Sequence, residues 1–208
     1  MKILLTGFDP FGELKTNPSQ TVIQAIKERW KPRLGVDLAT EVLPTEYAAA
    51  ESRIRKLVRE QRPDVILSVG VSQNLSSISL ERIAVNLDDE CAPDNAGEVR
   101  RGRRIVFDGA PAYWSTLPLE RIRNLLRGRG VPVSFSNHAG TYVCNHVFYA
   151  TLDEIRLRDF EARCGLIHVP LVAKQSKRSN KVGIGLPLDI MIIAIEGCIE
   201  AILKPEKP

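Results

Sequence analysis

Residues 64–70 read DVILSVG, a short apolar run that stops at a glycine. A run of this length is typical of a strand buried inside a sheet. Similar runs recur along the chain, and most are followed by a stretch whose apolar residues are spaced three or four apart. The predicted strands are 2–6, 36–43, 64–69, 131–135 and 164–169, and the predicted helices are 18–30, 46–60, 117–127, 142–158 and 186–203.

This alternation predicts an α/β protein with a mostly parallel sheet covered by helices on both faces. Residues 78–112 interrupt the alternation with strand-like pieces and two turn signals, PDNAG at 93–97 and DGAP at 108–111, which indicates a hairpin excursion. No repeat or linker divides the chain, so we expect one domain over residues 1–208. The helix at 186–203 is apolar almost all round and is expected to be buried against the sheet, another subunit, or both.

The composition is that of an ordinary soluble protein, with 208 residues, 44% hydrophobic and 26% charged, and a formal charge of +4. The run GEVRRGRR at 97–104 has no interleaved aromatic residues, so it predicts a solvated loop rather than a nucleic-acid surface. The N-terminal apolar run is too short for a signal peptide, and acidic residues interrupt segment 186–203, so we expect no membrane span and a cytoplasmic location. The four cysteines are far apart without a CxxC pair, which predicts free thiols and no metal site; they are Cys91, Cys144, Cys164 and Cys198.

Ligands of open α/β sheets bind beyond the carboxyl ends of the strands. The segments that follow the predicted strands here are rich in glycine, aromatic and polar residues. A further loop, 174–185, follows the last predicted strand and could cover this edge or contact another subunit. We therefore expect the chemistry to gather at one edge of the sheet, formed by GFDPFG at 7–12, GVSQN at 70–74, NHAGT at 137–141 and His168.

Cys144 lies in the stretch GTYVCNHVFY, residues 140–149, where a helix is predicted to begin. With Thr141 as the N-cap, Cys144 falls in the first turn of this helix. The helix dipole and the unpaired backbone amides favour a thiolate there and could bind an oxyanion, which indicates a nucleophile. The alternative is an unreactive buried thiol.

A nucleophilic cysteine needs a histidine, and the chain has three. His146 is two residues after Cys144 on the same predicted helix, so it points to another side, whereas His138 could line the preceding loop. His168 ends a strand at the expected edge and is the favoured partner by geometry. The alternative is a histidine that is only part of the core.

Glu81 could orient that imidazole. In SLERIAVNL at 79–87, strand alternation puts Glu81 on the same face as Ile83 and Val85. A carboxylate among apolar side chains needs a partner, and His168 would suit it. An ion pair with an arginine is the alternative.

Phe8 and Phe11 belong to TGFDPFG, which lacks the glycine and lysine pattern of a phosphate loop. Aromatic side chains beside an edge of backbone amides suit a small, uncharged, partly apolar ligand. Ordinary core packing is the alternative role for both rings.

The sequence resembles the pyroglutamyl peptidase I family, also called pyrrolidone-carboxylate peptidases, which are cysteine peptidases. The resemblance extends over nearly the whole chain, and several blocks in the same order make it specific. These blocks are LLTGFDPFG at 4–12, NPS at 17–19, LPTEY at 43–47, ERIAVN at 81–86, PDNAG at 93–97, DGAPAYWSTLP at 108–118, AGTYVCNHVFY at 139–149 and GLIHVP at 165–170.

This resemblance implies that Cys144, His168 and Glu81 form a catalytic triad. It implies hydrolysis of the amide bond after an N-terminal pyroglutamate through an acyl-enzyme, with peptides as substrates and with no metal or organic cofactor. The implied fold is a single-domain, three-layer α/β/α sandwich with a twisted central sheet. Bacterial members of the family commonly form homotetramers, so self-association is expected.

The implied pocket is apolar, so it accepts a neutral lactam and disfavours the ammonium group of an ordinary N-terminus. By resemblance its lining is Phe8, Phe11, Tyr142 and Val143, with Asn17 nearby and with backbone groups of Gly70 and Val71 bonded to the lactam.

Two segments depart from the family's pattern. Where the family usually reads DARIPDN, residues 89–95 read DECAPDN, so Cys91 replaces an arginine and Ala92 an isoleucine. Where the family usually reads GQAGG, residues 70–74 read GVSQN. The triad residues are intact, so we expect activity, and Ala92 suggests a wider pocket. Loss of the arginine motivates an alternative, a protein that binds pyroglutamyl ligands on the same fold without turning them over.

Overall fold

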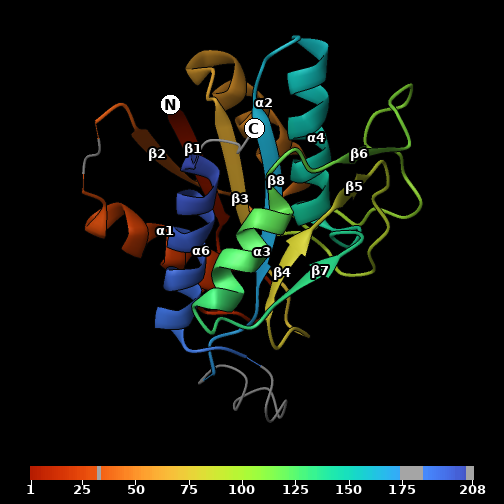
Figure 1. Ribbon diagram of the computed structural model, residues 1–208. Helices are drawn as coiled ribbons and strands as arrows, with labels where there is room; N and C mark the ends of the chain where they lie inside the picture. Colours follow the sequence, from red (N-terminus) through yellow and green to blue (C-terminus); the bar gives the residue numbers. More distant parts are fainter. Residues whose placement is uncertain (32–33, 174–184, 205–208) are drawn as a thin grey trace.

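The computed structural model describes residues 1–31, 34–173 and 185–204, and the loop at 174–184 lies outside the described residues. Its centre is a six-stranded sheet in the order β2-β1-β3-β8-β4-β7 (Figure 1). Four strands run parallel, β4 pairs antiparallel with β8, and β7 pairs parallel with β4. The prediction of a mostly parallel sheet is therefore confirmed. The strands are β1 (Lys2–Phe8), β2 (Asp37–Leu43), β3 (Val65–Val71), β4 (Ile78–Glu81), β7 (Val133–Ser136) and β8 (Arg163–Val169).

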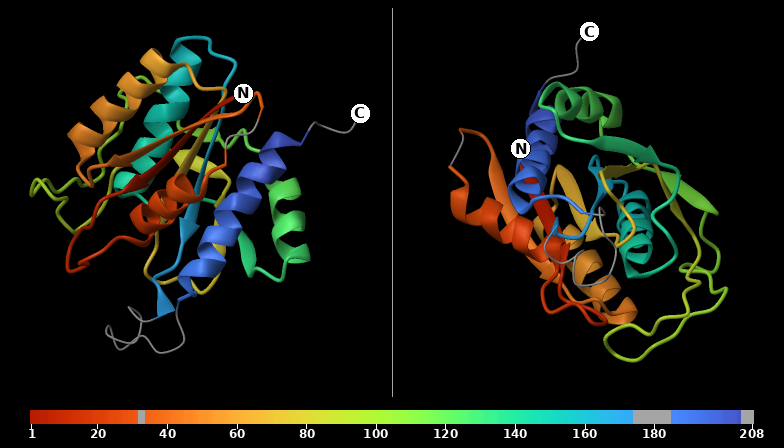
Figure 2. Two further views of the ribbon diagram at one scale, coloured as in Figure 1. Left: turned by 90° about the vertical axis from the view of Figure 1, so that its left-hand side faces the viewer. Right: turned by 90° about the horizontal axis from the view of Figure 1, so that it is seen from below.

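Helices cover both faces of the sheet, as predicted. On one face α1 (Pro18–Arg29), α3 (Leu119–Gly128) and α6 (Leu188–Leu203) enclose a first hydrophobic core. On the other face α2 (Tyr47–Gln61) and α4 (Val143–Leu157) enclose a second one, and Figure 2 shows the three layers edge-on. The α/β/α sandwich follows from this division of the apolar residues between two cores.

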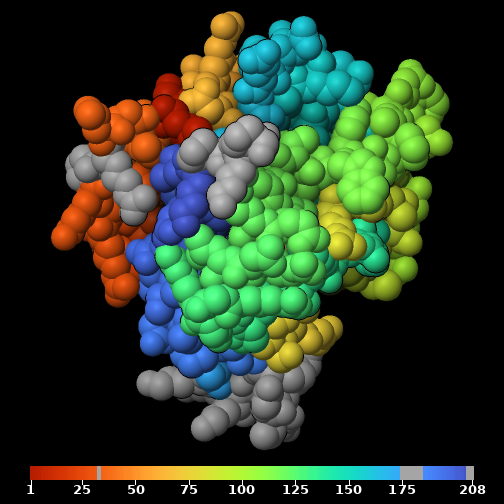
Figure 3. Space-filling model, viewed as in Figure 1, coloured from red at the N-terminus to blue at the C-terminus, as the bar shows by residue number. Residues whose placement is uncertain are grey.

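The apolar helix α6 is buried mostly within the subunit. It packs against α1 and α3 and adds eight buried side chains to the core on that face. In the space-filling view α3 covers the front of the molecule beside α6 (Figure 3). Among the described residues no helix combines the length and the apolar character needed to cross a membrane.

The excursion at 78–112 begins inside the central sheet. Its first strand is β4, after which the chain leaves the sheet at Arg82 and forms β5 (Ile83–Val85), which pairs antiparallel with β6 (Ala112–Trp114). The prediction of one continuous strand with Glu81, Ile83 and Val85 on a single face is therefore wrong. The apolar alternation continues across Arg82, and periodicity alone does not reveal that the two halves join different sheets.

Strand β8 presents alternate side chains to the two cores. Ile167 and Val169 belong to the core beneath α6, whereas Cys164 and Leu166 belong to the core beneath α4. Because side chains alternate along a strand, His168 points to the same side as α4. This placement brings it to the layer in which Cys144 lies.

Candidate active site

His168 and Glu81 meet across two adjacent antiparallel strands. Ser79 lies opposite His168 in the β4–β8 register, and Glu81 follows two residues later on the same face. Nδ1 of His168 is 2.9 Å from Oε1 of Glu81, and the Ser79 hydroxyl donates to the same oxygen at 2.8 Å. The predicted carboxylate partner of the histidine is therefore in contact with it, and no arginine takes that place among the described hydrogen bonds.

Both groups of this pair are deeply buried, and their interaction favours the charged forms. Burial lowers the pKa of His168, but interactions with Cys144 and Glu81 outweigh it and raise that pKa above its ordinary value. Burial alone would raise the pKa of Glu81, but interactions with His168 and with the hydroxyls of Ser136 and Ser79 together outweigh it, and the pKa is lowered. An imidazolium beside a carboxylate is therefore the stable state of the pair.

Cys144 is the second residue of α4 and lies in its first turn, as predicted. The N-cap is Tyr142, which makes no side-chain capping bond, so the prediction of Thr141 as N-cap is wrong. The Thr141 hydroxyl instead donates to the carbonyl of Asp89 at 2.7 Å and ties the excursion to this loop. No side chain of the described residues is found to accept from the amides of the first helical turn, which suits the binding of an oxyanion.

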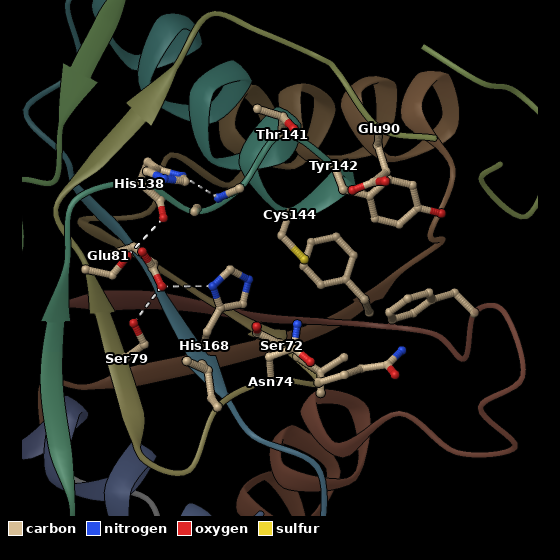
Figure 4. A pocket seen from close by; sticks show the side chains of 18 of the residues that line it. Ser72, Asn74, Ser79, Glu81, Glu90, His138, Thr141, Tyr142, Cys144 and His168 are labelled. Carbon is tan, nitrogen blue, oxygen red and sulfur yellow. Dashed lines mark hydrogen bonds and ion pairs between the residues drawn. The ribbon is translucent and has the colours of Figure 1, made fainter. Parts of the chain in front are cut away.

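Gly70 shows how close the thiol and the imidazole are. A Cβ atom at this position would lie 2.9 Å from Nε2 of His168 and 3.0 Å from Sγ of Cys144, so the two atoms border the same small space. In Figure 4 the Cys144 sulfur lies on the side of the helix that faces the His168 ring. The sequence indicated Gly70 only for its backbone, whereas the structure requires the absence of its side chain.

Cys144, His168 and Glu81 line a cavity of about 530 Å³. One end is aromatic, with the rings of Phe11 and Tyr142 packed at 5.9 Å between centroids, and Phe8 and Val71 beside them. The predicted lining residues Phe8, Phe11, Asn17, Val71 and Tyr142 all border this cavity, together with Cys144, His168 and Glu81.

Two of the predicted binding residues, Val143 and Gly70, do not line the cavity. A third, Asn17, also stabilises the fold. Val143 does not line the cavity, because its side chain is fully buried in the core beneath α4. Gly70 also lies outside the lining and borders the thiol and imidazole instead. Asn17 caps α1, since its Oδ1 accepts from the amide of Ser19 at 2.9 Å while its Nδ2 donates to the carbonyl of Asp9 at 2.8 Å.

The departures at 89–95 lie at the rim. Cys91 and Ala92 are exposed and do not line the cavity, so the structure does not support a wider pocket from Ala92. Their neighbour Glu90 does line it, and its Oε1 accepts from the amide of Cys91 at 2.8 Å. The changed segment therefore places a carboxylate at the cavity.

A buried ionic network behind α4 was not predicted. His146 is fully buried, with Nδ1 2.8 Å from Asp88 and Nε2 3.2 Å from Glu51. Arg100 bonds to the same Asp88 at 2.8 Å and is 11% exposed, so the prediction that its run is simply a solvated loop is wrong for this residue. The sequence carries no signal for it, because the partners come from segments far apart in the chain.

A thiol, an imidazole and a carboxylate in this order, at the start of a helix and beside free amides, is the arrangement that cysteine peptidases use for nucleophilic catalysis. The comparison with known proteins agrees. The profile of the pyroglutamyl peptidase family matches residues 1–205. The chain belongs to this family of cysteine peptidases.

Relatives and solved structures match over nearly the whole chain. A pyrrolidone-carboxylate peptidase of Bacillus cytotoxicus is 36% identical over 206 residues, covering 99% of this chain and 94% of that protein. Pyrrolidone-carboxylate peptidase 2 of Caldanaerobacter subterraneus is 38% identical, covering 98% and 97%. The crystal structure of pyroglutamyl peptidase I from Bacillus amyloliquefaciens superposes with a TM-score of 0.90 at 34% identity, covering 97% and 96%. That of pyrrolidone carboxyl peptidase from Thermococcus litoralis gives 0.91 at 32%, covering 97% and 93%.

Proposed function

We propose that this protein is a cysteine omega-peptidase that hydrolyses the amide bond after an N-terminal pyroglutamyl residue and releases free pyroglutamate. One observation carries the assignment of its residues. Sγ of Cys144 and Nε2 of His168 border one point, while Nδ1 of the same ring is held by Glu81 at 2.9 Å. Membership of the pyroglutamyl peptidase family supports the choice of substrate.

In the proposed reaction the Cys144 thiolate attacks the pyroglutamyl carbonyl carbon. The backbone amides of the first α4 turn, including that of Cys144, stabilise the oxyanion. His168 donates its Nε2 proton to the departing amine as the C–N bond breaks, which leaves a thioester on Cys144. His168 then takes a proton from water as the water oxygen attacks the thioester. The C–S bond breaks, pyroglutamic acid leaves and ionises, and the Cys144 thiolate is restored beside the His168 imidazolium. Glu81 holds the imidazole and stabilises its charged form.

The aromatic end of the cavity supports selection of a lactam. Phe8, Phe11 and Tyr142 offer apolar surface to the ring of pyroglutamate, and the backbone of Val71, which lines the cavity, is proposed to bond to its amide. An unblocked N-terminus would bring an ammonium group into this apolar environment and lose its hydration. The proposed chemistry uses protein groups and water only, so it needs no metal or organic cofactor.

We also propose a cytoplasmic location and a homotetrameric state, both from the family resemblance. Light scattering on the purified protein tests the second proposal, with a mass near four times 23.2 kDa expected. A monomeric mass would contradict it.

Cleavage of pyroglutamyl-naphthylamide tests the function. We expect the protein to release naphthylamine, and Cys144→Ser to lower kcat at least about 1,000-fold because a serine hydroxyl is far less acidic than a thiol. Cys91→Ser is the matched control, since Cys91 is an exposed thiol outside the cavity, and should retain activity. Binding of pyroglutamyl ligands without any cleavage by the unaltered protein would contradict the proposal.

A further inference from the structure

The cavity has two chemically different ends. The aromatic end holds Phe8, Phe11 and Tyr142, and the other end is lined by Ser134, Ser136 and other residues of β7 and the loop after it. In Figure 4 His138 and Tyr142 lie on opposite sides of Cys144. If pyroglutamate occupies the aromatic end, the rest of the peptide leaves toward β7.

Strand β7 is an edge of the central sheet and pairs with β4 alone among the described strands. Ile78 donates to the carbonyl of Pro132 at 2.9 Å, and Arg82 donates to the carbonyl of Ser136 at 2.9 Å. In a parallel ladder, alternate residues turn their backbone groups to opposite neighbours. The amide and carbonyl of Phe135 therefore point to the open edge, where no hydrogen bond to another described residue is found.

Phe135 is one of the residues that line the cavity. Its ring lies on the other face of the sheet, between the guanidinium groups of Arg82 at 4.1 Å and Arg123 at 4.5 Å from the centroid. The adjacent Ser134 and Ser136 are paired with Ser79 and Glu81, so their side chains face the reacting groups. An unused pair of main-chain groups thus lies at the border of the reaction cavity.

We propose that the open edge of β7 binds the peptide chain that follows the pyroglutamyl residue as an added strand, through the amide and carbonyl of Phe135. The proposal rests on the proposed function. Continuity of this edge with the cavity identifies the occupant, because the leaving part of the substrate must pass it. Strand addition uses main-chain hydrogen bonds and leaves side chains free, so it suits peptides of varied sequence.

The geometry sets the length of peptide that benefits. Strands lie about 4.8 Å apart and an extended chain rises about 3.3 Å per residue. Two strand spacings separate β8, which carries His168, from β7, so the outer edge comes within reach about three or four residues after the scissile bond. Shorter substrates would not contact it.

The first test uses substrates and leaves the enzyme unaltered. In pyroglutamyl-alanine peptides of two to seven residues, kcat/KM should rise once the chain passes about four residues. N-methylation of single amides in the longest peptide should lower kcat/KM about threefold to tenfold at one or two alternate positions, the range for a lost hydrogen bond. A flat dependence on length, or equal effects of methylation at every position, would overturn the proposal.

The second test uses Phe135→Pro and Phe135→Ala. Both remove the ring from between the two arginines, but only proline removes the amide donor, and an edge strand tolerates it there. The measured quantity is the ratio of kcat/KM for the long peptide to that for pyroglutamyl-naphthylamide. The ratio should fall toward the value for short peptides in Phe135→Pro, which keeps only the carbonyl, and should be unchanged in Phe135→Ala. Equal ratios in the two variants would refute edge binding.

The two proposals can fail separately. Absence of naphthylamide cleavage by the unaltered enzyme contradicts the peptidase function alone. The edge is then tested by calorimetry with Cys144→Ser and the same peptides, where affinity should rise with length and fall on N-methylation. If Phe135→Pro does not fold, the N-methylated peptides with the unaltered enzyme test edge binding.

Discussion

Two buried histidines, His168 on β8 and His146 on α4, have different uses. Each contacts a buried carboxylate, Glu81 in one case and Asp88 in the other. The second nitrogen of His168 faces the cavity beside Cys144, whereas that of His146 is 3.2 Å from Glu51. A carboxylate partner therefore does not make a histidine catalytic; a free nitrogen next to a nucleophile does.

Their charge states follow from the same comparison. Burial lowers the pKa of His146, but hydrogen bonds and charge interactions with Asp88 and Glu51 together outweigh it and raise that pKa. With an acceptor on each nitrogen, this ring holds both protons and exchanges neither with a substrate. It acts as a fixed cation that joins α2, α4 and the excursion.

Substitution of the two histidines should separate activity from stability. His168→Ala should lower kcat for pyroglutamyl-naphthylamide at least about 1,000-fold, because the proton donor to the leaving amine is lost. His146→Ala should lower the free energy of unfolding by about 3–5 kcal/mol, since it leaves buried carboxylates without their cation. Kinetics and urea unfolding measure the two effects, and a large loss of kcat in folded His146→Ala would break the distinction.

Gly70→Ala should have the next largest effect, on kcat/KM. The new methyl group would collide with Nε2 of His168 and Sγ of Cys144, so the reacting atoms must move apart. We expect a loss of at least about 100-fold in kcat/KM, typical of small misplacements of reacting groups. Gly128→Ala is the control, because a Cβ there meets nothing within 4 Å and should leave kcat/KM unchanged.

Arg100→Ala tests the network around His146. Its guanidinium bonds to Asp88, which is fully buried, so its removal should destabilise the fold by about 3 kcal/mol in urea unfolding. Arg101→Ala, one residue later and exposed, should change stability by less than about 0.5 kcal/mol. Equal and small changes in the free energy of unfolding would show that Arg100, like Arg101, does not stabilise the fold.

The smallest effect concerns pH. Burial would raise the pKa of Glu51, but interactions with His146 and Arg55 together outweigh it and lower the pKa from 4.5 to about 2. A depressed carboxyl pKa contributes stability that is full above 4.5 and is lost as pH falls toward 2. The free energy of unfolding should therefore fall less between pH 5 and pH 2.5 in Glu51→Gln than in the unaltered protein. Glu161→Gln, at an exposed position, should keep the original slope.

Much of the fold was predictable because the helices and strands follow from the spacing of apolar residues over short stretches of sequence. The apolar runs of β3 and β8 and the helical spacing of α4 depend only on neighbours in the sequence. The same local reasoning placed Cys144 in a first turn and turned His146 away from it.

The errors share one physical cause. The sequence could not show that Thr141 bonds to Asp89 instead of capping its helix, because those residues are 52 positions apart. It could not show that the strand pattern changes sheets at Arg82, nor that Arg100 is drawn into the interior by Asp88. In each case a contact between distant segments decided the outcome.

The sequence by itself determined the kinds of reacting group and the element on which each one lies, because strand and helix periodicity act over a few residues. Only the tertiary structure decided which groups meet. The register that sets Ser79 opposite His168 brings Glu81 to the imidazole, and the missing side chain of Gly70 lets the thiol reach the same point. Register and close approach depend on how the whole sheet packs, so no short stretch of sequence contains them.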